Sequence, residues 1–146
     1  MHMKKVETIE QFEQIYSSHR PFLLMKHSLT CPISHRAWVE FERFVKDFPH
    51  IHAYYLHVQH ARPLSQHIAE TFHVKHESPQ VLWVTDNGVA WHASHWNVTY
   101  DQMKKSNYER IIVAFCLYVN RLFVFLLKFL NIACSHKNKD SVIMVF

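Results

Sequence analysis

The chain has 146 residues, of which 49% are apolar and 19% charged, so it is long enough for one domain with a hydrophobic core. Its single glycine, Gly88, excludes a glycine-rich phosphate-binding loop of the Walker or dinucleotide type, because each needs several glycines. The formal net charge is +4, but residues 1–109 carry 11 basic and 11 acidic side chains. The excess charge therefore lies in residues 110–146 and predicts no nucleic-acid-binding surface on the preceding part.

The cysteine content points to a reducing compartment. Three cysteines, Cys31, Cys116 and Cys134, are too few and too widely spaced for a disulfide framework or a four-cysteine zinc site. No apolar segment typical of a secretory signal follows the polar first residues. We therefore expect a cytoplasmic protein.

Helix and strand signals alternate from the start of the chain. Thr8 and Gln11 have capping-box spacing, which predicts a short helix. Residues 22–25 form a continuous apolar run, as expected for a strand buried on both faces. Pro32 suits the first position of a helix, and the amphipathic pattern that follows it ends at Pro49.

The same alternation continues to a hairpin. Residues 51–58 predict a second strand, Pro63 opens another helix, and residues 80–85 predict a third strand. Asn87-Gly88 is a strong hairpin signal that needs a positive φ at both turn positions. Residues 89–91 would then return as a fourth strand.

A second capping box, Thr99 to Gln102, predicts a last short helix. The resulting order of elements is α-β-α-β-α-β-β-α. This order predicts an α/β fold with a mixed four-stranded sheet flanked by helices on both faces.

Residues 109–146 differ in composition from residues 1–108, which we expect to form the folded domain. In residues 111–134, 20 of 24 residues are apolar, and on a helical wheel the four polar ones share one stripe. The length suits a membrane span, although an arginine such as Arg121 costs about 2.5–3.5 kcal/mol at its centre. We expect an apolar helix that spans a membrane, lies on one or packs on the domain, unless the tail is a read-through product.

The chemistry is predicted to centre on Cys31. This residue follows a buried-type strand and directly precedes Pro32 and a helix, so its thiol would face the free N–H groups and the positive end of the helix dipole. Such a place stabilises the thiolate, the nucleophile of disulfide exchange, although a cysteine that only caps the helix is the alternative. Ser34 occupies the position of the second cysteine of a C-x-x-C motif, and its hydroxyl and that of Thr30 can donate to the thiolate.

Four sequence blocks resemble the monothiol bacilliredoxin family of the thioredoxin-like superfamily. They are residues 26–34 (KHSLTCPIS), 62–65 (RPLS), 76–81 (HESPQV) and 91–96 (WHASHW). The resemblance covers about residues 4–107. It implies a thioredoxin-like fold in which the Ser78–Pro79 bond is cis and lies beside the sulfur of Cys31.

The resemblance also implies a reaction and its participants. Cys31 would remove bacillithiol from protein mixed disulfides, with bacillithiol as the low-molecular-weight thiol, bacillithiolated client proteins as substrates, an external resolving thiol, and no tightly bound cofactor. The residues expected to bind substrate are Pro32, Ser78, Pro79, Gln80, Lys26, His27 and Trp96. Of these, Lys26 or His27 would contact an anion, and Trp96 would wall a groove near Cys31.

Two other functions stay open. A C-x-x-S motif permits an iron–sulfur cluster carrier with Cys31 and a low-molecular-weight thiol as ligands, which a visible absorption band after anaerobic reconstitution would reveal. A non-enzymatic thioredoxin-like module held at a membrane by residues 111–134 is the other. The three H-x-x-H pairs predict no metal site, because on a strand such spacing points the two rings to opposite faces.

Overall fold

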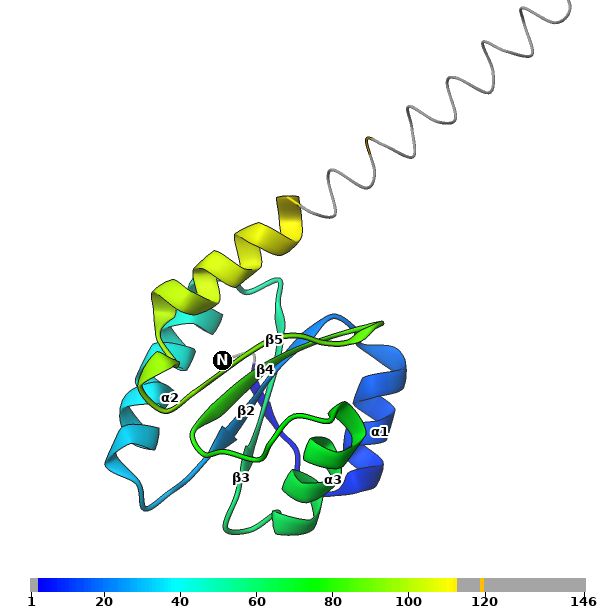
Figure 1. The fold of residues 1–146 in the computed structure, drawn as a ribbon, viewed down its shortest axis with the longest axis vertical. Helices are drawn as coiled ribbons and strands as arrows, with labels where there is room; N and C mark the ends of the chain where they lie inside the picture. Colours follow the sequence, from blue (N-terminus) through cyan, green and yellow to red (C-terminus); the bar gives the residue numbers. More distant parts are fainter. Residues whose placement is uncertain (1–2, 113–118, 120–146) are drawn as a thin grey trace, which may run out of the picture. The chain divides into compact units, whose positions relative to one another are not determined.

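The computed structural model describes residues 3–112 and Val119. A mixed five-stranded sheet runs through the described part of the chain (Figure 1). Its strands are β1 (Met3–Lys5), β2 (Phe22–His27), β3 (His52–His57), β4 (Gln80–Thr85) and β5 (Gly88–Ser94). Their order in the sheet is β1-β3-β2-β4-β5. The first three are mutually parallel, whereas β4 runs antiparallel to β2 and β5 antiparallel to β4.

Helices cover both faces of this sheet, and Figure 1 shows α2 on one side with α1 and α3 on the other. They are α1 (Ile9–Ser18), α2 (Pro32–Asp47), α3 (Arg62–Phe72), the short 3-10 helix η1 (His95–Asn97), and a helix over residues 100–112. The expected α/β fold is confirmed. The last helix is longer than the short one that the sequence predicts.

Both predicted capping boxes begin helices. The Thr8 hydroxyl accepts the backbone N–H of Gln11 at 3.3 Å, while the Gln11 side chain accepts the N–H of Glu7 at 2.9 Å. The Thr99 hydroxyl accepts the N–H of Gln102 at 3.3 Å. These bonds satisfy N–H groups that the first turn of a helix leaves without a partner.

The sheet has one strand more than the predicted four. β1 pairs in parallel with β3, with Met3 opposite Ala53 and Lys5 opposite Tyr55. It is an edge strand of three residues without a buried one, so it carries no apolar run or alternation that a sequence pattern could detect. Pairing with β3, rather than local preference, makes it a strand.

The hairpin between β4 and β5 forms, but its turn differs from the predicted one. Thr85 pairs with Gly88, so the connecting residues are Asp86 and Asn87. Among residues 85–88, only Gly88 has a positive φ, at +93°. The expectation of a positive φ at Asn87 is therefore wrong. The hydroxyl of Thr85 stabilises this turn by accepting from the Asn87 N–H at 3.3 Å and donating to the Gly88 carbonyl at 3.0 Å.

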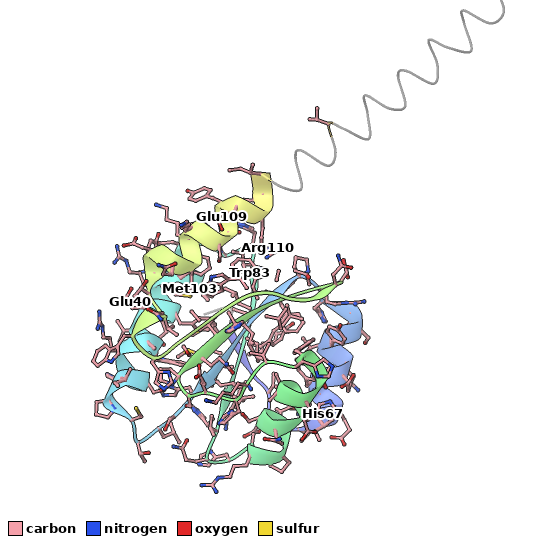
Figure 2. The ribbon with its side chains drawn as sticks, in the orientation of Figure 1. Glu40, His67, Trp83, Met103, Glu109 and Arg110 are labelled. Carbon is pink, nitrogen blue, oxygen red and sulfur yellow. The ribbon has the colours of Figure 1, made fainter. Side chains whose placement is uncertain are left out.

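Each face of the sheet contributes to a separate hydrophobic core. Leu23 and Met25 of β2 pack on the α2 side, together with Phe41, Phe44 and Trp83. Leu24 lies on the opposite side. Figure 2 shows Met103 and Glu40 on the α2 side and His67 on the α3 side. The same alternation sends the last two residues of β2, Lys26 and His27, to opposite faces.

The chain divides into two compact units, residues 1–106 and 107–146. An apolar helix is predicted over residues 111–134, and most of this range lies outside the described residues. So do both of its cysteines, Cys116 and Cys134. No helix that the structure describes is both long and apolar enough to span a bilayer.

Candidate active site

Cys31 lies where the carboxyl end of β2 meets the start of α2. It is the N-cap residue of α2, with an extended backbone (φ −101°, ψ 119°), and Pro32 begins the helix. Its carbonyl accepts the N–H of His35 at 3.1 Å, but its thiol makes no capping hydrogen bond. The side chain is half-buried, and Cys31 is the one free cysteine of the described residues. The sulfur is thus left available to a substrate at the positive end of a helix.

The hydroxyl of Ser34 ties the first turn of α2 to the end of β2. Ser34 is fully buried, accepts the backbone N–H of Ser28 at 2.8 Å, and shares a hydrogen bond of 2.9 Å with Nδ1 of His27. The structure therefore shows no bond from this hydroxyl to Cys31, although the sequence led us to expect one. The Ser34 hydroxyl is instead hydrogen-bonded to His27 and Ser28 at the end of β2.

Gln59, in the loop after β3, holds the three residues that precede Cys31. Its Oε1 accepts the N–H of Leu29 at 3.2 Å, and its Nε2 donates to the hydroxyls of Ser28 at 2.8 Å and Thr30 at 3.3 Å. Thr30 therefore accepts from Gln59, and its own proton is free to be donated elsewhere. Sequence reasoning missed Gln59, because nothing in its neighbours marks a side chain that reaches 30 residues back.

His27 is a buried, neutral imidazole on the α2 side of the sheet. Its ring centroid lies 4.9 Å from that of Trp38 and 5.5 Å from that of His57. Burial, with smaller contributions from the charges of His57 and His35, lowers the pKa of His27 to about 4. The expected anion contact needs a charged ring, which this environment disfavours near neutral pH.

Lys26 is buried on the other face of the sheet, below α3. Its Nζ donates to the carbonyl oxygen of Ser65 at 3.1 Å. Burial lowers the pKa of Lys26 to about 8, so the ammonium is still mostly charged near neutral pH. Of the two residues considered for an anion contact, only Lys26 therefore carries a charge.

The predicted proline lies at the same end of the sheet. The Ser78–Pro79 bond is cis, as expected, and so is Arg20–Pro21, which the sequence did not predict. Gln80 pairs with Lys26 in the ladder, so Pro79 comes one residue beyond this pair, beside the strand end that leads to Cys31. The Pro79 carbonyl accepts the N–H of His95 at 3.0 Å.

Three further residues of the predicted site differ in exposure. Trp96, in η1, is 60% exposed, and the guanidinium of Arg36 in α2 lies 5.2 Å from its ring centroid. Pro32 is exposed on the first turn of α2. Gln80 is fully buried, and its Nε2 donates to the Lys75 carbonyl at 2.9 Å. Trp96 and Pro32 are therefore open to a partner, whereas Gln80 is held inside.

Metal binding finds no support in the described residues. They contain no group of three or more histidine, cysteine or acidic side chains placed to hold an ion. In one H-x-x-H pair, the ring centroids of His57 and His60 lie 5.8 Å apart.

Solved structures share the fold of this chain. A structure assigned as an oxidoreductase with a thioredoxin fold is 34% identical, has a TM-score of 0.68, and covers 73% of this chain and 94% of its own. Fasciola hepatica thioredoxin is 13% identical, with a TM-score of 0.58, and covers 71% of this chain and 95% of its own. Trypanosoma brucei brucei thioredoxin is 15% identical, with a TM-score of 0.60, and covers 73% of this chain and 88% of its own. The fold is thus that of the thioredoxin-like proteins.

The sequence identifies a family within the thioredoxin-like proteins. Residues 4–103 match the monothiol bacilliredoxin BrxC family, and the chain belongs to that family. The resemblance noted in the sequence is confirmed, and family and fold together give the protein a thiol redox role.

Proposed function

We propose that this protein is a monothiol thiol–disulfide oxidoreductase that removes bacillithiol from protein mixed disulfides. The observation that carries the proposal is the state of the Cys31 thiol, which is half-buried, free of capping bonds and placed at the N-terminus of α2. A helix N-terminus stabilises a thiolate, and the thiolate is the attacking species. Ser34 stands where a dithiol enzyme has its second sulfur, and its hydroxyl is already hydrogen-bonded.

The proposed reaction has two exchange steps. The Cys31 thiolate attacks the bacillithiol sulfur of the mixed disulfide, forms a Cys31–bacillithiol disulfide, and releases the client cysteine as a thiolate that water protonates. A second low-molecular-weight or protein thiolate then attacks this adduct, regenerates the Cys31 thiolate and leaves as a disulfide with bacillithiol. No oxygen of Ser34 can take the place of that second thiol.

Other residues of the site would position the substrate. The backbone at Ser78 and Pro79 is expected to pair with the chain or thiol that carries the disulfide, and the free proton of Thr30 can be donated to a developing thiolate. Exposed Trp96 and Pro32 offer apolar contact to a client protein. We propose that these events take place in the cytoplasm.

Mass spectrometry of the intact protein tests this function. The chain is mixed with a client protein carrying bacillithiol on a single cysteine, and the expected product is a Cys31–bacillithiol adduct that persists until a thiol is added. Cys31→Ser should form no adduct and leave the client modified. A client carrying glutathione, tested in parallel, measures the preference between the two thiols. An unmodified Cys31 together with an unchanged client would refute the proposal.

A further inference from the structure

A pocket opens beside α3, on the sheet face that holds Lys26. It has a volume of about 400 Å³ and is lined by Val58, Arg62, Ser65, Gln66 and His76. We call it the α3 pocket. Pockets of this size are typical of small-ligand sites.

Two walls of the α3 pocket belong to segments that also flank Cys31. The N–H of Val58 donates to the carbonyl of His27 at 2.9 Å, and the next residue, Gln59, binds the loop that precedes Cys31. On another wall, His76 is three residues before Pro79. The segments that line the pocket are therefore continuous with the segments that position Cys31 and Pro79.

The groups around the α3 pocket are those that bind an anion. Arg62 is exposed, and no carboxylate of the described residues forms an ion pair with it. The ammonium of Lys26 lies against the Ser65 carbonyl, and Nδ1 of His76 is 3.0 Å from the Ser65 hydroxyl.

Two carboxylates, those of Glu70 and Glu77, neighbour the residues that line the pocket. Gln66, which lines the pocket, donates from its side-chain Nε2 to Oε1 of Glu70 at 2.8 Å; both residues belong to α3. Glu77 follows His76 in the chain; its Oε2 lies 4.0 Å from Nδ1 of His95, and its negative charge also reaches His76. Arg62 and Lys26 are the positive groups here, and within the described part of the chain neither forms an ion pair with these carboxylates.

We infer that the α3 pocket binds a carboxylate of the low-molecular-weight thiol, with Arg62 as its main contact and Lys26 as a second charge below. This inference rests on the proposed function, in which that thiol becomes attached to Cys31. The fork of an arginine side chain matches the two oxygens of a carboxylate. Arg62 is then a specificity-determining residue, because it distinguishes an acidic thiol from a neutral one.

Binding of unreactive ligands tests the pocket separately from the chemistry. The full chain, labelled with ¹⁵N, is titrated with S-methylbacillithiol, with S-methylglutathione and with the uncharged 3-(methylthio)-1,2-propanediol. We expect saturable amide shifts centred on Arg62, Leu64 and His76 with the acidic thioethers only. Either acidic compound meets the expectation, and the ratio of their dissociation constants identifies the preferred source of the carboxylate.

Two charge-removing variants sharpen the result. Arg62→Gln should weaken binding roughly five- to tenfold, as expected for loss of one charge-assisted bond. Arg43→Gln removes the same charge from α2, on the other side of the sheet, and should leave the dissociation constant unchanged. Equal binding of the neutral thioether, shifts centred elsewhere, or an unaffected Arg62→Gln would each overturn the inference.

The outcomes separate the pocket from the proposed function. If the Cys31–bacillithiol adduct forms but the thioethers show no saturable binding, the carboxylate site is refuted and the redox function stands. If the thioethers bind in a way that depends on Arg62 but no adduct forms, the anion site stands and the redox function is refuted. If both hold, Arg62→Gln should raise KM for the bacillithiolated client, leave kcat within about twofold, and not affect a client that carries mercaptoethanol.

Discussion

Two neighbouring side chains at the end of β2 show how one strand serves both faces of the site. Lys26 points to the α3 side and His27 to the α2 side, and both are buried. Burial disfavours the charged form of each, so the pKa of Lys26 falls to about 8 and that of His27 to about 4. Near neutral pH the strand therefore offers a charge to one face and a neutral hydrogen-bonding ring to the other.

The lowered pKa of His27 makes stability depend on pH. Below its ordinary value of 6.5 the unfolded chain takes up a proton on His27, whereas the native protein does so only below about 4. The free energy of unfolding should therefore fall as pH drops through this window, by ~1.4 kcal/mol per unit for this one group, and level off below it. Denaturant unfolding at pH 7 and 4.5 measures the loss.

His27→Asn provides the matched control for this titration. The carboxamide can still bond to the Ser34 hydroxyl but does not titrate. Between pH 7 and 4.5 the free energy of unfolding of the variant should fall by about 2 kcal/mol less than that of the parent chain. His57 and His76, whose pKa values are also lowered, titrate in both proteins, so the difference reports His27 alone. Parallel pH profiles of the two proteins would show that His27 is not held neutral.

Two substitutions of Ser34 separate its structural bonds from its position. Ser34→Ala and Ser34→Cys both remove the strong acceptor of the Ser28 N–H and should cost ~1–3 kcal/mol of unfolding free energy. Only Ser34→Cys adds a thiol one helical turn from Cys31, and it should shorten the life of the Cys31–bacillithiol adduct by internal attack. Mass spectrometry of the adduct over time distinguishes them. An adduct that lasts equally long in both variants would mean that residue 34 does not face the sulfur.

At the scale of elements, the loop before Cys31 depends on a side chain from another loop. Gln59 makes all its bonds to residues 28–30. Gln59→Leu keeps a similar volume but removes these bonds, so the amide of Leu29 should exchange with solvent about tenfold faster. Hydrogen exchange read by NMR measures this rate. Gln14→Leu, on the exposed face of α1, is the control and should leave Leu29 unchanged; an equally protected Leu29 in Gln59→Leu contradicts the proposed role.

Elements with their own sequence pattern could be predicted, and contacts between distant elements could not. The apolar run of β2 and the proline at the start of α2 each specify local structure, and they place Cys31 between them. β1 escapes such a pattern because three edge residues become a strand only through β3. The roles given to Ser34 and Thr30 miss their partners for a similar reason, since the competing partners His27, Ser28 and Gln59 meet them only after folding.

At the scale of the whole described domain, one sheet separates two hydrophobic cores. Residues of β2 and β4 alternate between them, so that Leu23 and Val81 belong to the α2 side while Leu24 and Leu82 belong to the other. Each strand is thus held by both cores at once. Loss of one core removes the packing on one face of the active end of β2.

This shared sheet predicts that the two cores unfold together. Leu24 is fully buried on the side away from α2, whereas Trp38, Trp83 and Trp91 all pack on the α2 side. Leu24→Ala should cost ~2–5 kcal/mol. It should shift the denaturant midpoint seen by tryptophan fluorescence as far as the one seen by far-UV circular dichroism, because a two-state domain gives coincident transitions. Val39→Ala, at a position 51% exposed on α2, should move both by ~0.5 kcal/mol or less. If the fluorescence transition of Leu24→Ala stayed at the parent midpoint while the dichroism moved, the cores would be independent, and β2 could not transmit packing from the α3 face to Cys31.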